Sequence, residues 1–352
     1  MRHRTQKHRP SRIAALLCLS FCLFCGVSAI GAAGQPRQKE PDGPVELFTL
    51  AYTGDDFKTP QVWEDDGVVP FHEDLFPILT ATPDPNRESL PVEERLIDGG
   101  ARVADFFVRD TSGSGVDLAA ALEETPSVGF RRDGSVEILI YHTHTSEAYS
   151  QSYTGFYYTD METRSGNQEK NVVAAGEALK ASLEAQGFGV VHDTTVNDET
   201  FNGSYSRSWE VIQKNLAEHP GIQVTIDLHR DSMTTESGLK YKPTVTVGGR
   251  KAAQVMLLAG CDANGDWGDF PDWEQNLRLA LRVQQRLTEL YPGLARPLDF
   301  SDCKYNMNAT PGSMLIEVGT EVNTAAEAKY SGKLLGEALG SLFAELKPGE
   351  ES

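Results

Sequence analysis

Apolar and polar positions follow a different pattern in the two parts of the chain, and the change falls near residue 135. Beyond it, short apolar runs are separated by segments whose apolar residues recur every three or four positions. Such runs predict buried strands, and such spacing predicts amphipathic helices. The expected strands are 136–141, 189–192, 222–228, 243–247, 254–260 and 314–318, and the expected helices pass through Val172 to Leu183, through Trp209 to Leu216, over 274–291 and on from Thr324.

Turn and capping residues mark the ends of these segments. Gly187 stands where a glycine ends a helix, and Pro220 and Pro292 each stop a helical pattern. Thr324 and Glu327 have the spacing of a capping box, which predicts the start of the last helix.

The order of these elements predicts the fold class. Strands that alternate with helices indicate an α/β domain of three layers, in which helices flank a mostly parallel sheet. This domain is expected to cover residues 131–346, and residues 347–352 are expected to form a disordered tail.

The first 33 residues have the pattern of a membrane segment. A basic flank with four arginines and a lysine precedes an apolar run over residues 13–33 that contains no charge. A run of about 20 apolar residues is long enough to span a bilayer once. We expect a retained anchor with the basic flank in the cytoplasm and all later residues outside. The alternative is a signal that is cleaved near Gly31, which would release a secreted protein.

Residues 34–130 are expected to form an extracytoplasmic stalk or appended region. Residues 35–44 are polar and rich in proline, as in a linker. Scattered aromatic residues follow without a sustained period, so the pattern assigns no chemistry to this part of the chain.

The charge and the cysteines narrow the choice of functions only slightly. The net charge of −19 argues against a nucleic-acid partner, because phosphate binding requires clustered lysine and arginine. Outside the apolar run the chain has only Cys261 and Cys303. Two cysteines give no disulfide pattern, and we interpret them as unrelated thiols.

Ionisable residues follow three of the predicted strands. The strand 136–141 runs into His142-Thr-His144-Thr-Ser-Glu147, the strand 222–228 runs into His229-Arg230-Asp231, and the strand 314–318 contains Glu317. Side chains at the ends of strands meet at one edge of such a sheet, where ligands bind. The sequence therefore predicts a metal or catalytic site at that edge.

Zinc is the metal that this set of residues favours. Imidazole and carboxylate ligands suit zinc, and a catalytic zinc site has three protein ligands and one open position. Zinc polarises a carbonyl and activates water, which amide hydrolysis requires, and a carboxylate such as Glu317 then serves as the general base. A serine hydrolase is disfavoured, because the chain has no Gly-X-Ser-X-Gly elbow.

Two other classes of function remain open on the residues alone. A metal-dependent phosphoesterase also begins with His-X-His after a strand, but it draws on further histidines, and His192 and His219 have no such setting. A non-catalytic wall-binding or scaffold protein is the second alternative. It is disfavoured because every candidate ligand and base is present.

Six blocks of sequence resemble the stage II sporulation protein P family of cell-wall hydrolases. They occur in family order from residue 135 to the C-terminal end, and a single N-terminal anchor also fits. The blocks are Ile138-Leu-Ile-Tyr-His-Thr-His-Thr-Ser-Glu-Ala-Tyr149, Gly203-Ser-Tyr-Ser-Arg207, Ile226-Asp-Leu-His-Arg-Asp-Ser232, Tyr291-Pro-Gly-Leu294, Tyr305-Asn306 and Leu315-Ile-Glu-Val-Gly-Thr320 with Asn323-Thr324.

The resemblance implies an activity and partners. The family is similar to the zinc N-acetylmuramoyl-L-alanine amidases, so it implies cleavage of the bond between muramic acid and L-alanine in peptidoglycan. It also implies an endopeptidase activity on cross-links and a role in forespore engulfment. The implied partners are the sporulation protein D glycan lyase and the polytopic membrane protein M.

The resemblance further implies site residues. It implies zinc ligands at His229, at His144 or His142, and at Glu169, with Glu147 as the rival carboxylate. It implies that Glu317 is the catalytic glutamate. Arg230 and Asn306 lie in family motifs and are candidates, like Glu147, for substrate-binding or supporting positions.

Overall fold

The computed structural model describes residues 82–348. The predicted membrane segment over residues 1–33 and residues 349–352 of the predicted tail lie outside the described residues. Within 82–348, no helix combines the length and the apolar character that crossing a bilayer requires.

Twelve strands and five helices make up the described part of the chain. The strands are β1 Ser89–Arg95, β2 Ala101–Val103, β3 Phe106–Asp110, β4 Val136–Tyr141, β5 Phe156–Tyr158, β6 Gly189–His192, β7 Val224–Asp231, β8 Lys240–Val247, β9 Arg250–Ala253, β10 Val255–Gly260, β11 Leu298–Ser301 and β12 Met314–Thr320. The helices are α1 Leu118–Glu123, α2 Val172–Glu184, α3 Ser204–Glu218, α4 Trp273–Leu290 and α5 Ala325–Phe343.

The fold is mixed α/β, and its main sheet has eight strands in the order β2-β3-β11-β10-β12-β7-β4-β6. The main sheet is mostly parallel, as predicted, with two antiparallel pairs, β10 with β12 and the edge strand β2 with β3. Strands β12, β7, β4 and β6 are parallel to one another, and so are β10, β11 and β3, but β10 is antiparallel to β12. The chain enters β10 directly from β9, without the crossover helix that a parallel neighbour requires, so the direction reverses.

A smaller sheet has the order β5-β1-β8-β9. Strands β8 and β9 form a hairpin through Gly248 and Gly249, whose φ angles of 53° and 73° suit the tight turn. Strand β1 pairs with β8, and β3 pairs with β11 of the main sheet. Residues 89–110 were expected in an appended region, but the structure builds them into both sheets.

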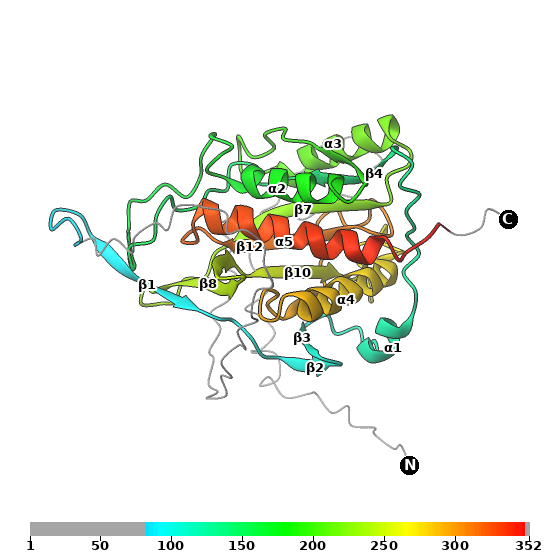
Figure 1. The fold of residues 1–352 in the computed structure, drawn as a ribbon, viewed down its shortest axis with the longest axis horizontal. Coiled ribbons are helices and arrows are strands. Elements are labelled where there is room, and N and C mark those ends of the chain that lie inside the picture. The colour runs from blue at the N-terminus through cyan, green and yellow to red at the C-terminus, as the bar shows by residue number, and fades with distance from the viewer. Residues whose placement is uncertain (1–81, 349–352) are drawn as a thin grey trace, which may run out of the picture. The chain divides into compact units, whose positions relative to one another are not determined.

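Helices α2, α5 and α4 cover one face of the main sheet (Figure 1). Ile140 in β4 and Ile226 in β7 point into this layer and join the main core. A Cβ on Gly332 of α5 would lie 2.3 Å from the carbonyl oxygen of Ala175 in α2, so glycine permits this close helix contact. The predicted capping box of α5 is confirmed, because Thr324 and Glu327 bond reciprocally.

Helix α3 covers part of the opposite face. Leu139 and Tyr141 alternate with the isoleucines of β4 and pack with Ile212 of α3 in a separate apolar cluster. The prediction of two unpaired thiols is also confirmed, since Cys261 and Cys303 are buried and free.

Candidate active site

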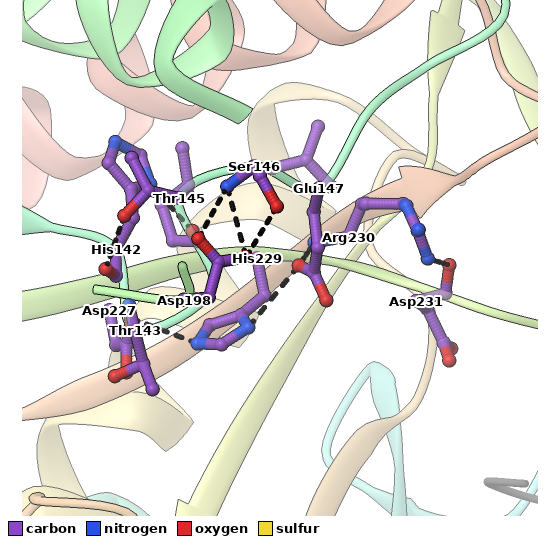
Figure 2. Close-up of polar contacts among 12 residues, drawn as sticks. His142, Thr143, Thr145, Ser146, Glu147, Asp198, Asp227, His229, Arg230 and Asp231 are labelled. Atoms are coloured by element: carbon purple, nitrogen blue, oxygen red, sulfur yellow. Dashed lines mark hydrogen bonds and ion pairs between the residues drawn. The ribbon is translucent and has the colours of Figure 1, made fainter. Parts of the chain in front are cut away.

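The segment after β4, residues 142–147, is a buried loop whose direction is fixed by two aspartates (Figure 2). The Thr143 N–H donates to Asp227 Oδ1 at 2.8 Å, and its hydroxyl donates to Asp227 Oδ2 at 2.6 Å. The Ser146 hydroxyl donates to Asp198 Oδ2 at 2.6 Å. These bonds anchor the loop at Thr143 and Ser146, so the neighbouring side chains of His142, His144 and Glu147 are held in defined directions.

His142 is directed away from the other candidate residues, toward α2. Its Nδ1 lies 2.7 Å from the carbonyl oxygen of Leu228, which only accepts, so Nδ1 carries the hydrogen. Its Nε2 lies 2.8 Å from Nε2 of His192. A Cβ on Gly176 would lie 2.6 Å from His192 Nε2, so glycine makes room for the pair. Burial and the charge of His192 lower the pKa of His142 to about 3, and both of its nitrogens are occupied.

His144, His229 and Glu147 come together where β4 and β7 end. The ring centroids of His144 and His229 are 5.4 Å apart, with an interplanar angle of 85°. Glu147 Oε2 lies 3.4 Å from His229 Nδ1 and accepts from the backbone N–H of Arg230 at 3.1 Å (Figure 2). The structure therefore gathers two imidazoles and one carboxylate from different segments of the chain.

Two carboxylates enclose the His229 ring. Asp227 Oδ1 lies 2.9 Å from Nε2 but off the direction of a hydrogen bond, so the contact is electrostatic. Burial alone would lower the pKa of His229, but Asp227 and Glu147 outweigh it and raise this pKa well above its usual value. Burial would raise the pKa of Glu147, but the His229 and Arg230 charges hold it well below its usual range. The two carboxylates thus favour the positively charged form of the His229 ring between them.

Glu317 in β12 lies beside His229 in the sheet. The two residues are partners in the parallel register of β12 and β7, and both side chains point to the α3 face. Glu317 Oε2 is buried and has no hydrogen-bond partner among the described residues. Burial and the charge of Asp231 raise the pKa of Glu317 to about 8. A carboxylate that titrates near neutral pH suits a general base.

Aromatic rings line the site beside His144. The Phe201 ring stacks on His144 at a centroid distance of 4.9 Å and an interplanar angle of 7°. Tyr205 of α3 meets the edge of His144 at 5.8 Å and packs against Tyr305 at 5.2 Å. Tyr305 has a left-handed φ of 40°, which a non-glycine residue adopts at a cost and which is typical of functional sites.

The donors present fit a zinc ion in their chemistry. The buried Nδ1 of His144 has no hydrogen-bond partner among the described residues, and Nδ1 of His229 faces Glu147. Two imidazoles and a carboxylate are typical zinc ligands, and a carboxylate behind a histidine, here Asp227, is the usual support. As they stand, no three such side chains within 82–348 are arranged to hold a metal ion.

A profile of the family described as "Stage II sporulation protein P (SpoIIP)" matches residues 112–340. The chain belongs to this family. It is 27% identical over 219 residues to stage II sporulation protein P of Bacillus subtilis (strain 168), a match that covers 58% of this chain and 51% of the relative. The chain thus spans about half the length of the curated relative that it matches.

Two solved structures are similar to this SpoIIP-family chain at low identity. The CwlD amidase from Clostridioides difficile, in complex with the GerS lipoprotein, is 12% identical with a TM-score of 0.36, over 59% of this chain and 99% of that one. The N-acetylmuramoyl-L-alanine amidase AmiC2 of Nostoc punctiforme is 12% identical with a TM-score of 0.34, over 60% and 98%. TM-scores below 0.5 support no conclusion about this chain.

The structure places Glu169 apart from the clustered histidines. Its side chain is 80% exposed, and it pairs with Lys329 at 3.3 Å. Glu147, the rival carboxylate, is the one beside His229. His142 and Glu169 were both expected as possible ligands, but neither lies with His144 and His229. The nitrogens of His142 contact Leu228 and His192, and Glu169 pairs with Lys329 at the surface.

Arg230 and Asn306 hold SpoIIP-family segments around the site in place. The Arg230 guanidinium donates to the carbonyl oxygens of Ala148 at 3.2 Å and Thr163 at 2.9 Å. The Asn306 amide donates to the Tyr205 carbonyl oxygen and to Ser208 Oγ, each at 3.0 Å. Both side chains thus fix backbone next to the candidate ligands.

The sequence reasoning gave no role to two residues of the site, Asp227, which it placed at the end of its strand, and Arg296. Asp227 precedes His229 by two positions, so the alternation of a strand places both on one face, and that signal was available. Arg296 pairs with Asp231 at 2.8 Å, but it follows a turn far along the chain and carries no local signal.

Proposed function

We propose that this chain is a peptidoglycan hydrolase that cleaves the amide bond between N-acetylmuramic acid and L-alanine. The observation that carries the proposal is the meeting of His144, His229, Glu147 and Glu317 on one face of the sheet. Membership of the stage II sporulation protein P family supports it. We propose zinc as the cofactor, with His144, His229 and Glu147 as the residues that would hold it.

The side chains around this site have separable roles in the proposed reaction. Zinc, when bound, would supply polarisation of the scissile carbonyl and activation of the attacking water. Glu317 would serve as the general base, taking a proton from the attacking water and delivering it to the leaving amine nitrogen of L-alanine. Asp227 orients the His229 ring, and the rings of Phe201 and Tyr205 exclude water from the side of His144.

The wider context of the activity is also part of the proposal. By family resemblance, the enzyme acts in engulfment during sporulation, with sporulation proteins D and M as partners, and a second activity on stem-peptide cross-links is included. Residues 1–33 would anchor the chain in the cell membrane, so that the catalytic residues face the wall. These residues lie outside the described part.

Digestion of purified peptidoglycan tests the proposed reaction. The wild type is expected to release peptides with a new L-alanine amino terminus, and His229→Ala and Glu317→Gln are expected to lose this activity at least about 100-fold. Circular dichroism and thermal unfolding would confirm that the variants are folded. Equal release by all three proteins would refute the assigned site, and peptide binding without release by the folded, zinc-loaded wild type would favour a scaffold protein.

A further inference from the structure

Arg296 is a buried arginine at the edge of the candidate site. It lies between α4 and β11, where its backbone N–H donates to the Val255 carbonyl oxygen at 2.8 Å and its own carbonyl oxygen accepts from Gln284. The residue is 3% exposed. These backbone bonds fix the point from which its long side chain extends.

Within the described residues, only one nitrogen of the Arg296 guanidinium has a hydrogen-bond partner. Nη1 donates to Asp231 Oδ2 at 2.8 Å and lies 3.1 Å from the Met233 sulfur. Nε and Nη2 are buried and have no hydrogen-bond partner among the described residues. A buried donor without a partner is destabilising, so two on one side chain indicate a group that a ligand completes.

The two unused nitrogens have the geometry that a carboxylate matches. Nε and Nη2 lie on one edge of the planar guanidinium, and their N–H groups point the same way. Arginine binds carboxylates through two parallel N–H···O bonds of this kind, whereas lysine offers only a point charge.

The strand that carries Asp231 relates this edge to the candidate metal ligands. Asp231 follows His229 by two positions in β7, which is about 7 Å along a strand. Glu317, on the neighbouring strand, experiences the charges of both Asp231 and Arg296. Arg296, through its bond to Asp231, is therefore attached to the same end of β7 as the candidate ligand His229.

We propose that Arg296 binds a carboxylate of the stem peptide, on the residue that follows L-alanine. The inference rests on the proposed amidase function and adds a specificity-determining residue to the same site. Arg296 then distinguishes stems with a free α-carboxylate at this residue from stems in which that group is a carboxamide.

Two acidic side chains of the protein, Asp299 and Glu317, lie within electrostatic reach of Arg296. Asp299 in β11 accepts from the Ser301 hydroxyl at 2.5 Å, so one of its oxygens is already occupied. Glu317 has a free Oε2 and is the stronger competitor. If Arg296 served Glu317 rather than the substrate, its replacement would affect acid and amide substrates equally.

Because Arg296 is buried, a ligand reaches its guanidinium only when a neighbouring side chain shifts. Met233 is 6% exposed, and its sulfur touches Nη1. Its unbranched side chain has three rotatable bonds and repacks readily, as methionines at adaptable binding surfaces do.

Equilibrium binding of two dipeptides to the full-length protein tests the proposal without relying on catalysis. The probes are L-alanyl-D-glutamate with the γ-carboxyl blocked as a methylamide and the α-carboxylate free, and the same blocked dipeptide with an α-carboxamide. Calorimetry is expected to give about 10- to 100-fold tighter binding of the acid to the wild type. In Arg296→Lys the preference is expected to fall below about threefold, while the affinity for the amide changes little.

The control is Arg286→Lys, a conservative change in α4 at an arginine that pairs with Glu345. It is expected to keep the wild-type preference. Equal affinities for the two dipeptides, or a preference that survives in Arg296→Lys, would overturn the proposal. If the protein cleaves muramoyl substrates but binds the two dipeptides equally, only the role of Arg296 is refuted. If it prefers the acid dipeptide but cleaves no muramoyl substrate, only the amidase function is refuted.

Discussion

Asp227 contacts both the loop after β4 and the candidate metal ligand His229. Removing its charge therefore tests directly whether it supports metal binding by His229. Asp227→Asn preserves the shape of the side chain. One oxygen remains to accept from the Thr143 N–H, where the present distance is 2.8 Å. The negative charge 2.9 Å from His229 Nε2 is removed.

Asp227→Asn is expected to reduce metal affinity more than fold stability. Carboxylates that support a metal-bound histidine contribute about 10- to 100-fold to metal affinity, which equals about 1.4–2.8 kcal/mol. The loss of fold stability should be smaller, about 1 kcal/mol. In the variant the Thr143 hydroxyl can donate to Ser208 Oγ, which lies 2.8 Å from it in the wild type.

Zinc affinity is measured by competition with a chelating dye, and fold stability by urea denaturation. Asp299→Asn is the matched control, because Asp299 is also buried in a strand but bonds to Ser301 rather than to a histidine. Asp227→Asn should weaken zinc binding at least about tenfold while the control does not. Wild-type affinity in Asp227→Asn, or an equal loss in the control, would refute the proposed support of His229.

Three further predictions concern other residues. Glu147→Gln should abolish peptidoglycan cleavage and zinc retention, whereas Glu169→Gln, at an exposed ion pair, should leave both within about twofold of wild type; metal analysis and peptide release check this. Gly176→Ala should lower the free energy of unfolding by about 1 kcal/mol in urea denaturation, because a Cβ 2.6 Å from His192 costs more than the gain in helix propensity; a stabilised variant would contradict the packing. Lys242→Met should lower it by about 3 kcal/mol, since Lys242 is fully buried and its loss leaves the Glu327 carboxylate without its cation; no change would show that the pair contributes nothing.

The sequence predicted those helices and strands that are specified by neighbouring residues in the chain. The strand over 136–141 is a continuous apolar run, and helix α5 begins at a capping box that is complete within four residues, so each was readable from neighbouring positions. Strands β1 and β2 were not predicted, and residues 103–108, which overlap β3, were left open between strand and helix. These strands are short, and β1 and β3 gain their stability from pairing with β8 and β11, which lie far away in the chain. The reversal at β10 is likewise a property of how distant strands meet.

The candidate site was predictable in part, and strand geometry explains the rest. Alternation along β4, continued by one residue, places His142 on the face of Ile140 and away from His229. That alternation is a property of neighbouring positions, so it is enough to separate His142 from His144. The choice between Glu147 and Glu169 could not be made that way, because it depends on how the loop after β4 folds back over β7.

Anomalous diffraction at the zinc absorption edge from crystals of the zinc-loaded protein tests the central claim most directly. The account predicts one zinc peak bonded at about 2.0–2.2 Å to a nitrogen of His144, a nitrogen of His229 and an oxygen of Glu147, with Glu317 facing the open position. A peak bonded to His142 or Glu169 instead, or no ordered zinc among these side chains, would contradict it.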